Sequence, residues 1–476
     1  MGELYDLLSK LRKEKGDDYV NEKYGDIIFG LKYPEFYYHY ALYSKEANIK
    51  FYEAVVLESK DPEYCYLFAK DIKGADIKAH EAVVLESKST KYCYLFAKDV
   101  EGADIEAHEA VVLESKDLEY CYLFAKNVKE ANIKSLEKIV LETKNPEYCC
   151  KFAQEIKGTD IKAHEAVVLE SKDLEYCYLF AKNVKGANIK AHEAVILESK
   201  NLEYCCKFAA EIKGADIEAH EAVVLESKDP EYCYLFAVKV GGYDEDLEKV
   251  VLESRSPKYC CLFAINVSGY AKDTSGLEKV VLESKNPEYC CGFACYVSGA
   301  DIKAHETVVL ESKNPEYCYL FARSVKGADI KAHEAVVLES KNPEYCYLFA
   351  RSVKGADIKA HEAVVLESKN LEYCYLYAKS VKGANIQSLG LVVLESKDPE
   401  YCCGFASNIK GLENEFIKAL EKNVLESKNP KYCCEFVFNV PQANVEEHAK
   451  VVYDGDSYAE KHKMDYFLGK HHRRFK

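Results

Sequence analysis

The chain repeats one 28-residue sequence many times. Residues 301–328 and 329–356 differ at a single position, where Thr307 corresponds to Ala335. A "VLES"-type segment recurs every 28 residues, with exceptional spacings of 27, 30 and 31. We count fourteen clear repeats and one degenerate repeat at each end. A repeat this short cannot bury a hydrophobic face alone, so the copies must stack on one another.

Each repeat predicts two short helices. Helix A reads "DIKAHEAVVLES" from Asp76, and its leading Asp or Asn can cap the free N–H groups of the helix start. Helix B reads "DPEYCYLFAKD" from Asp61, with Pro at the first helical position and Glu in the first turn. Gly74 follows helix B, where a left-handed residue is expected. All length changes fall between helix B and the next helix A, so the A–B hairpin is the constant element.

These signals predict an all-α fold, namely a right-handed-type α-solenoid of about fourteen clear 28-residue helix-turn-helix repeats plus degenerate end caps. We expect an N-terminal cap with a degenerate repeat over 1–47, the repeat array over 48–440, and a C-terminal degenerate repeat with a basic tail over 441–476. The little-changed residues predicted to face inward are Tyr64, Cys65, Phe68, Ala69 and Ile72 in helix B and Ile77, Val84 and Leu85 in helix A, with Ala82 and Val83 beside them.

Charge and hydropathy limit the classes of partner. The net charge is −16, and Lys and Glu are interleaved, whereas nucleic-acid-binding domains usually carry a basic stripe. We therefore expect no nucleic-acid partner, although the tyrosines leave single-stranded RNA binding as a less favoured alternative. No apolar run approaches ~18 residues and the start lacks a signal-peptide core, which predicts no membrane partner and a cytoplasmic location.

The 21 cysteines are predicted to be free thiols. Fourteen occupy one repeat position, exemplified by Cys65, and equivalent positions in stacked helices lie roughly 9–10 Å apart. That separation exceeds the ~7 Å Cα limit for a disulfide, which indicates a reducing, intracellular compartment. Six further cysteines directly follow the first, and we expect these to be half-exposed: Cys150, Cys206, Cys261, Cys291, Cys403 and Cys434. Cys295 is the remaining one.

No catalytic, cofactor or metal site is predicted. The "AHEAVV" segment lacks the second His of a zinc metalloprotease, because Val84 occupies that place. The glycines of "SGYAKDTSG" from Ser268 lack the order of a phosphate-binding loop, and we expect a plain loop. We interpret the recurring His as a partly exposed helix-A residue, with a pH-responsive surface as the alternative. These histidines are His80, His108, His164, His192, His220, His305, His333 and His361.

Positions 66, 67, 70 and 71 of helix B vary between repeats and are the candidate partner-binding strip. Exposed Tyr at the first of these positions suits protein contacts, while the alternative is that Tyr covers the seam between neighbouring helices. The hypothesis is a non-enzymatic protein-binding scaffold or inhibitor, and the alternative is a structural, self-assembling protein. The candidate residues are Tyr66, Lys70, Tyr94, Lys98, Tyr122, Lys126, Tyr178, Tyr234, Tyr319, Arg323, Tyr347, Arg351 and Tyr375.

The helix-B signature "DPEYCYLFAKDIKGA" resembles repeats of uncharacterised proteins common in phages and large DNA viruses. The likeness covers most of Tyr33–Val440, and the geometry is similar to short HEAT-type repeats. Cys65 stands where those repeats often have Ala, and Phe68 where they have Tyr. The resemblance implies an α-helical repeat fold and suggests a viral origin, but it implies no activity. The residues that carry it are Asp61, Pro62, Tyr64, Tyr66, Ala69 and Ile72.

Overall fold

The computed structural model describes residues 33–43, 49–241, 243–267 and 273–471. Within these ranges the chain forms 31 α-helices and a single π-helical turn, with no β-strand, which confirms the all-α prediction. Contacts divide the chain into an N-terminal unit, Met1–Glu226, and a C-terminal unit, Ser227–Lys476. Much of the expected N-terminal cap, most of the loop from Ser268 and the end of the basic tail lie outside the described residues.

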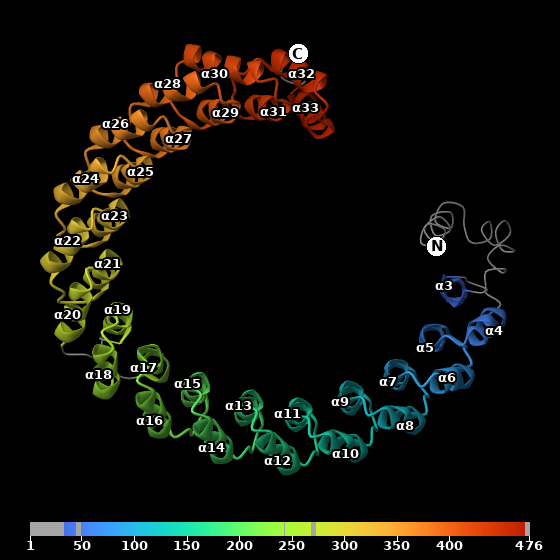
Figure 1. Ribbon diagram of the computed structural model, residues 1–476. Helices are drawn as coiled ribbons and strands as arrows, with labels where there is room; N and C mark the ends of the chain where they lie inside the picture. The colour runs from blue at the N-terminus through green and yellow to red at the C-terminus, as the bar shows by residue number, and fades with distance from the viewer. Residues whose placement is uncertain (1–32, 44–48, 242, 268–272, 472–476) are drawn as a thin grey trace. The chain divides into compact units, whose positions relative to one another are not determined.

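In the N-terminal unit, B helices and A helices alternate along the chain, and consecutive helices pack as hairpins. The B helices form the inner layer of this curved unit and the A helices the outer layer (Figure 1). The B helices are α3 (Pro34–Tyr43), α5 (Pro62–Asp71), α7 (Thr90–Asp99), α9 (Leu118–Asn127), α11 (Pro146–Glu155), α13 (Leu174–Asn183) and α15 (Leu202–Glu211). The A helices are α4 (Ile49–Ser59), α6 (Ile77–Glu86), α8 (Ile105–Ser115), α10 (Ile133–Thr143), α12 (Ile161–Ser171), α14 (Ile189–Ser199) and α16 (Ile217–Ser227).

The C-terminal unit, taken by itself, has the same two layers, again with the B helices on its inner side (Figure 1). The B helices are α17 (Pro230–Phe236) with the π-helical turn η1 (Ala237–Gly241), α19 (Pro257–Asn266), α21 (Pro287–Tyr296), α23 (Pro315–Ser324), α25 (Pro343–Ser352), α27 (Leu371–Ser380), α29 (Pro399–Asn408), α31 (Pro430–Asn439) and the terminal α33 (Tyr458–His471). The A helices are α18 (Glu245–Glu253), α20 (Ser275–Glu283), α22 (Ile302–Glu311), α24 (Ile330–Glu339), α26 (Ile358–Ser368), α28 (Ile386–Ser396), α30 (Asn414–Glu426) and α32 (Val445–Asp454).

The helices begin and end where the capping signals predict. The Asp61 carboxylate accepts the N–H of Glu63 at 2.9 Å, and the Asp76 carboxylate accepts the N–H of Ala79 at 3.1 Å. Gly74 adopts φ +88°, a left-handed conformation that a side chain would oppose. Two of the three changes in repeat length fall before α18 and α20, between a B helix and the next A helix, as expected. The third was expected in the same place but lengthens the A helix itself: α30 has 13 residues against 10 in α24, while five residues precede each helix.

The constant length of the A–B turn has a local cause. The Ser59 hydroxyl donates to the carbonyl of Val56 at 2.6 Å and accepts the N–H of Asp61 at 3.2 Å. Lys60 between them is left-handed at φ 54°. Because this arrangement recurs from repeat to repeat, an inserted residue would break its two hydrogen bonds at once.

The core lies between the two layers and continues from one repeat to the next. Cys65, Phe68 and Val84 are fully buried, in agreement with the prediction. The Cys65 thiol lies 3.8 Å from the Val56 carbonyl of helix A, which gives this small buried residue a weak hydrogen bond. Ala82 was expected beside the apolar set, but it is exposed because it lies on the outer side of its helix.

Candidate interaction surface

The first candidate position is occupied by eight seam tyrosines, which lie between neighbouring B helices rather than facing solvent. Tyr66 is only 6% exposed, and its ring contacts Tyr92 of the next repeat with centroids 6.4 Å apart. Of the two interpretations given above, exposure of these rings is wrong and the alternative, that Tyr covers the seam between repeats, is confirmed. The seam tyrosines are Tyr66, Tyr94, Tyr122, Tyr178, Tyr319 and Tyr347, which are buried, and Tyr234 and Tyr375, which are half-buried.

Each seam tyrosine also has a polar end. The Tyr66 hydroxyl donates to Asp99 at 2.7 Å, and the Tyr122 hydroxyl donates to Glu155 at 2.6 Å. Both acceptors belong to the next repeat. Burial, followed by the hydrogen bond to Glu155, raises the pKa of Tyr122 above its ordinary value, so the ring stays neutral. Each of these two tyrosines therefore links its own repeat to the next by a hydrogen bond.

Cations one helical turn further along cover the seam tyrosines, and they are exposed. We call these residues the stacked cations. They comprise the Lys and Arg residues of the predicted strip and two further residues that were not predicted, Lys182 and Lys379. The signal for both was present, since each follows a Tyr by four residues on one helical face. Distances from the cation to the ring centroid are 5.4 Å for Lys70, 5.8 Å for Lys98, 5.3 Å for Lys126, 5.3 Å for Lys182, 5.3 Å for Arg323, 5.8 Å for Arg351 and 5.3 Å for Lys379.

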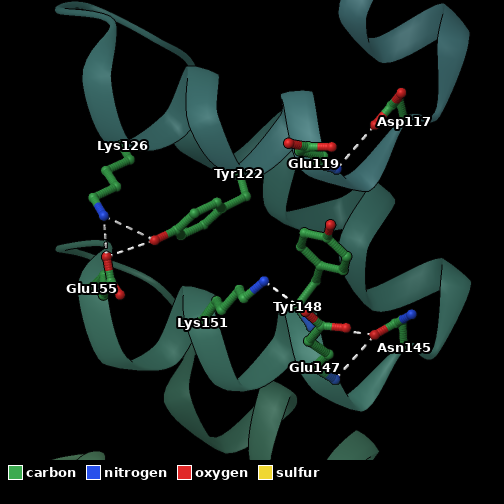
Figure 2. A network of polar contacts seen from close by, with 9 residues as sticks. All are labelled: Asp117, Glu119, Tyr122, Lys126, Asn145, Glu147, Tyr148, Lys151 and Glu155. Atoms are coloured by element: carbon green, nitrogen blue, oxygen red, sulfur yellow. Dashed lines mark hydrogen bonds and ion pairs between the residues drawn. The ribbon is translucent and has the colours of Figure 1, made fainter. Parts of the chain in front are cut away.

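Figure 2 shows one such cluster between α9 and α11. Lys126 donates to the Tyr122 hydroxyl at 3.0 Å and pairs with Glu155 at 2.5 Å. The Lys126 contact holds the pKa of the Glu155 carboxyl below its usual value. Nearby, Lys151 pairs with Glu147 at 2.6 Å. At this place the charges of the inner surface neutralise one another.

The second cysteine of each "YCC" segment is buried, against the expectation of a half-exposed residue. It takes the place of a seam tyrosine between two B helices, and the smaller side chain is enclosed there. Burial raises the pKa of the Cys150 thiol to about 11 and that of the Cys261 thiol to about 12. Cys295 is half-buried, while every other cysteine is buried and all are free thiols. The six have exposed fractions of 5% for Cys150, 2% for Cys206, 4% for Cys261, 6% for Cys291, 4% for Cys403 and 1% for Cys434.

The recurring histidine is fully buried, so the predicted partly exposed residue and pH-responsive surface are both wrong. His164 contacts the Phe152 ring at 5.6 Å, and its Nε2 lies 3.1 Å from Oε1 of Glu137 in the preceding A helix. The same carboxylate oxygen accepts the N–H of Asp160, the cap of the next A helix, at 2.6 Å. The Glu of one repeat therefore binds two groups of the next.

Sequence reasoning missed this His–Glu clamp because its partners are 27 residues apart. Burial lowers the pKa of His80 to about 4, so the ring is neutral at pH 7. The clamp pairs are His80–Glu53, His108–Glu81, His164–Glu137, His192–Glu165, His220–Glu193, His305–Glu278, His333–Glu306, His361–Glu334 and His448–Glu421.

Comparisons with family models, curated proteins and solved structures give no match. Within the described ranges, no helix combines the length and apolar character needed to cross a bilayer. The same ranges contain no cluster of three or more His, Cys, Asp or Glu side chains suited to a metal ion. Function is therefore inferred from the surface of the helices.

Proposed function

We propose that the chain is a non-enzymatic scaffold that binds a protein partner along the solvent-exposed side chains of its B helices. One observation carries this proposal: two exposed positions near the end of helix B, those of Lys70 and Asp71, differ widely from repeat to repeat. At the position of Lys70 other repeats carry Gln154, Cys295 or Phe438, and at the position of Asp71 they carry Asn, Glu, Lys, Ser or Tyr. On helix A the exposed Glu86 position is Glu in all fourteen clear repeats, and the exposed Ala82 position is Ala or Lys in all but two.

Exposed aromatic side chains on the same surface support binding to a protein. Tyr296 on α21 is 73% exposed, and Phe438 on α31 is 42% exposed. Aromatic side chains bury much area at low cost in rotamer entropy and dominate many protein interfaces. Both lie on B helices, so we take them as candidate anchors. The Phe438 ring also packs against Phe467, with centroids 4.9 Å apart.

The test is an affinity capture from the native cell extract at moderate salt, followed by mass spectrometry and absorbance at 260 nm. The tagged wild type is compared with Tyr296→Ser (the α21 swap), which gives α21 the residue that α23 has at the corresponding position, Ser324. A matched control, Thr307→Ala on α22, changes an exposed A-helix residue to the one found in the next repeat.

The proposal predicts a protein recovered in fixed proportion to the chain, reduced by the α21 swap and unaffected by Thr307→Ala. Recovery of only further copies of the chain would contradict it and favour a self-assembling structural role. A 260 nm signal that decreases with salt would contradict it in favour of nucleic acid.

A further inference from the structure

Three consecutive B helices, α23, α25 and α27, carry a row of fixed cations. Arg323 donates from Nη1 to the hydroxyl of its seam tyrosine at 2.8 Å, Arg351 does so at 3.0 Å, and Lys379 donates from Nζ at 3.1 Å. All three side chains are exposed, and each also covers the tyrosine ring. We call these three residues the cation row.

The N-terminal unit shows what a neutralised cation of this kind looks like. There Lys126 pairs with Glu155, 29 residues later, at 2.5 Å (Figure 2). Lys182 pairs in the same way with Glu211, also at 2.5 Å. In the cation row the residues 29 positions later are Ser352, Ser380 and Asn408. Among the described residues, no carboxylate lies within 4.0 Å of a cation-row nitrogen, although the same geometry elsewhere in the chain provides one.

The positive charge extends beyond the row. The segments "RSVK", "RSVK" and "KSVK" that end the three helices hold six cations and no acidic residue: Arg323, Lys326, Arg351, Lys354, Lys379 and Lys382. The corresponding residues of the flanking helices, "CYVS" after α21 and "SNIK" after α29, are nearly neutral. In a chain of net charge −16, the row is a bounded cationic patch three repeats long.

The chemistry of the patch favours carboxylates. An Arg held at its tyrosine keeps further N–H donors in a planar fork that matches a carboxylate, and its fixed position reduces the entropy lost on binding. Packed helices lie roughly 9–10 Å apart. In the polyproline II conformation three residues make one turn and span about 9 Å, so acidic side chains at every third position would lie on one side of the segment and meet successive helices.

We propose that α23, α25 and α27 bind an extended acidic segment of a protein partner, with a carboxylate on each member of the cation row. This inference rests on the proposed function and adds the chemistry of the partner. A nucleic acid is the less suitable occupant, because a strand carries a phosphate about every 3.4 Å and so more phosphates than the row has cations. Exposed Glu316, Glu344 and Glu372, in the first turn of the same three helices, would repel the phosphates left unpaired.

The direct test is fluorescence anisotropy with the full chain and a labelled peptide of three Asp-Ser-Gly units. Ser352→Glu/Ser380→Glu places a carboxylate beside Arg323 and Arg351 in the arrangement that Glu155 already has beside Lys126. The matched control is Ser352→Asn/Ser380→Asn, since Asn occupies this position in α9 and α13. Both pairs of substitutions use residues that the repeat already accommodates.

We expect the Asp peptide to bind the wild type and the Asn control, and to bind the Glu variant roughly tenfold more weakly, from two exposed ion pairs. The wild type should bind a peptide of three Asn-Ser-Gly units no more tightly than the Glu variant binds the Asp peptide. Equal affinity of wild type and Glu variant for the Asp peptide would overturn the inference. So would tighter binding of a labelled twelve-residue oligothymidylate, or self-association in sedimentation that the Glu variant abolishes.

The same variants separate this inference from the proposed function. If a captured protein partner is lost with the α21 swap but kept by Ser352→Glu/Ser380→Glu, the scaffold proposal stands and the acidic segment is wrong. If neither variant changes the recovered protein, both are wrong.

Discussion

Lowering the pH from 7.5 to 5.0 should destabilise the repeat array through its buried histidines. His80 and His108 are fully buried, and burial lowers their pKa to about 4, against 6.5 for an unburied ring. Because the folded chain holds the neutral form, the stabilisation is complete above pH 6.5 and is lost as the pH falls through 6.5 toward 4. At pH 5.0 this pKa difference costs about 2 kcal/mol of unfolding free energy for each histidine.

The groups that face the ring do not reverse the sign. Nε2 of His108 lies 3.2 Å from Oε1 of Glu81, and Asp104 is close enough to favour the protonated ring. The pKa of His108 is nevertheless lowered, because burial outweighs the effect of these carboxylates. The Phe96 ring covers the imidazole, with ring centroids 5.0 Å apart, and no solvent reaches it. Exposed carboxylates remain mostly ionised at pH 5.0, so the loss of unfolding free energy between pH 7.5 and 5.0 comes from the histidines.

The assay is urea unfolding followed by circular dichroism at both pH values, for the wild type and for His80→Leu/His108→Leu. Leu is native at this position in another repeat, where Leu136 is fully buried, so the variant should fold. Between pH 7.5 and 5.0 the variant should lose about 4 kcal/mol less stability than the wild type, from two histidines. Equal losses would refute the reasoning.

Three further outcomes follow from single positions. Lys116 is left-handed at φ 54°, so Lys116→Gly should stabilise the N-terminal unit by about 1 kcal/mol in urea unfolding, while Lys116→Ala should not. Iodoacetamide at pH 8 should alkylate Cys295 before the other cysteines, as read by mass spectrometry. Burial raises the pKa of the Cys65 thiol to about 12, so rapid alkylation of Cys65 would contradict the packing. Gly390→Ala should lower the free energy of unfolding by about 1–3 kcal/mol, because the added Cβ would lie 2.8 Å from the Phe416 ring. An increase in stability, as Gly→Ala gives at an exposed helix position, would show that the ring moves aside.

Most of what lies within one repeat could be predicted from the sequence. The caps at Asp61 and Asp76 and the left-handed Gly74 all depend on residues close together in the chain. Local signals of this kind are set by backbone hydrogen bonds and steric limits, which change little with tertiary context.

What lies between repeats could not be predicted in the same way. Whether Tyr66 or His80 is exposed depends on how closely the next repeat packs, and helical periodicity does not contain that distance. A polar residue such as His suggests a surface position, unless the partner that compensates for its burial is recognised. The sequence pairs the two changes only once, where Gly390 replaces the clamp Glu and the next repeat has Leu420 in place of His. Four other repeats have Leu at the His position and keep the preceding Glu, so the pairing of His with Glu could not be recognised.

The most direct test of the account is lysine footprinting of the chain in its captured complex. Acetylation of free and bound chain, read by mass spectrometry, compares the B-helix lysines with the A-helix lysines. Protection of Lys379 and Lys382 while Lys303 and Lys359 stay reactive is the result we predict, since partner contacts belong to the B-helix surface. Protection of the A-helix lysines with the B-helix lysines still reactive would contradict it.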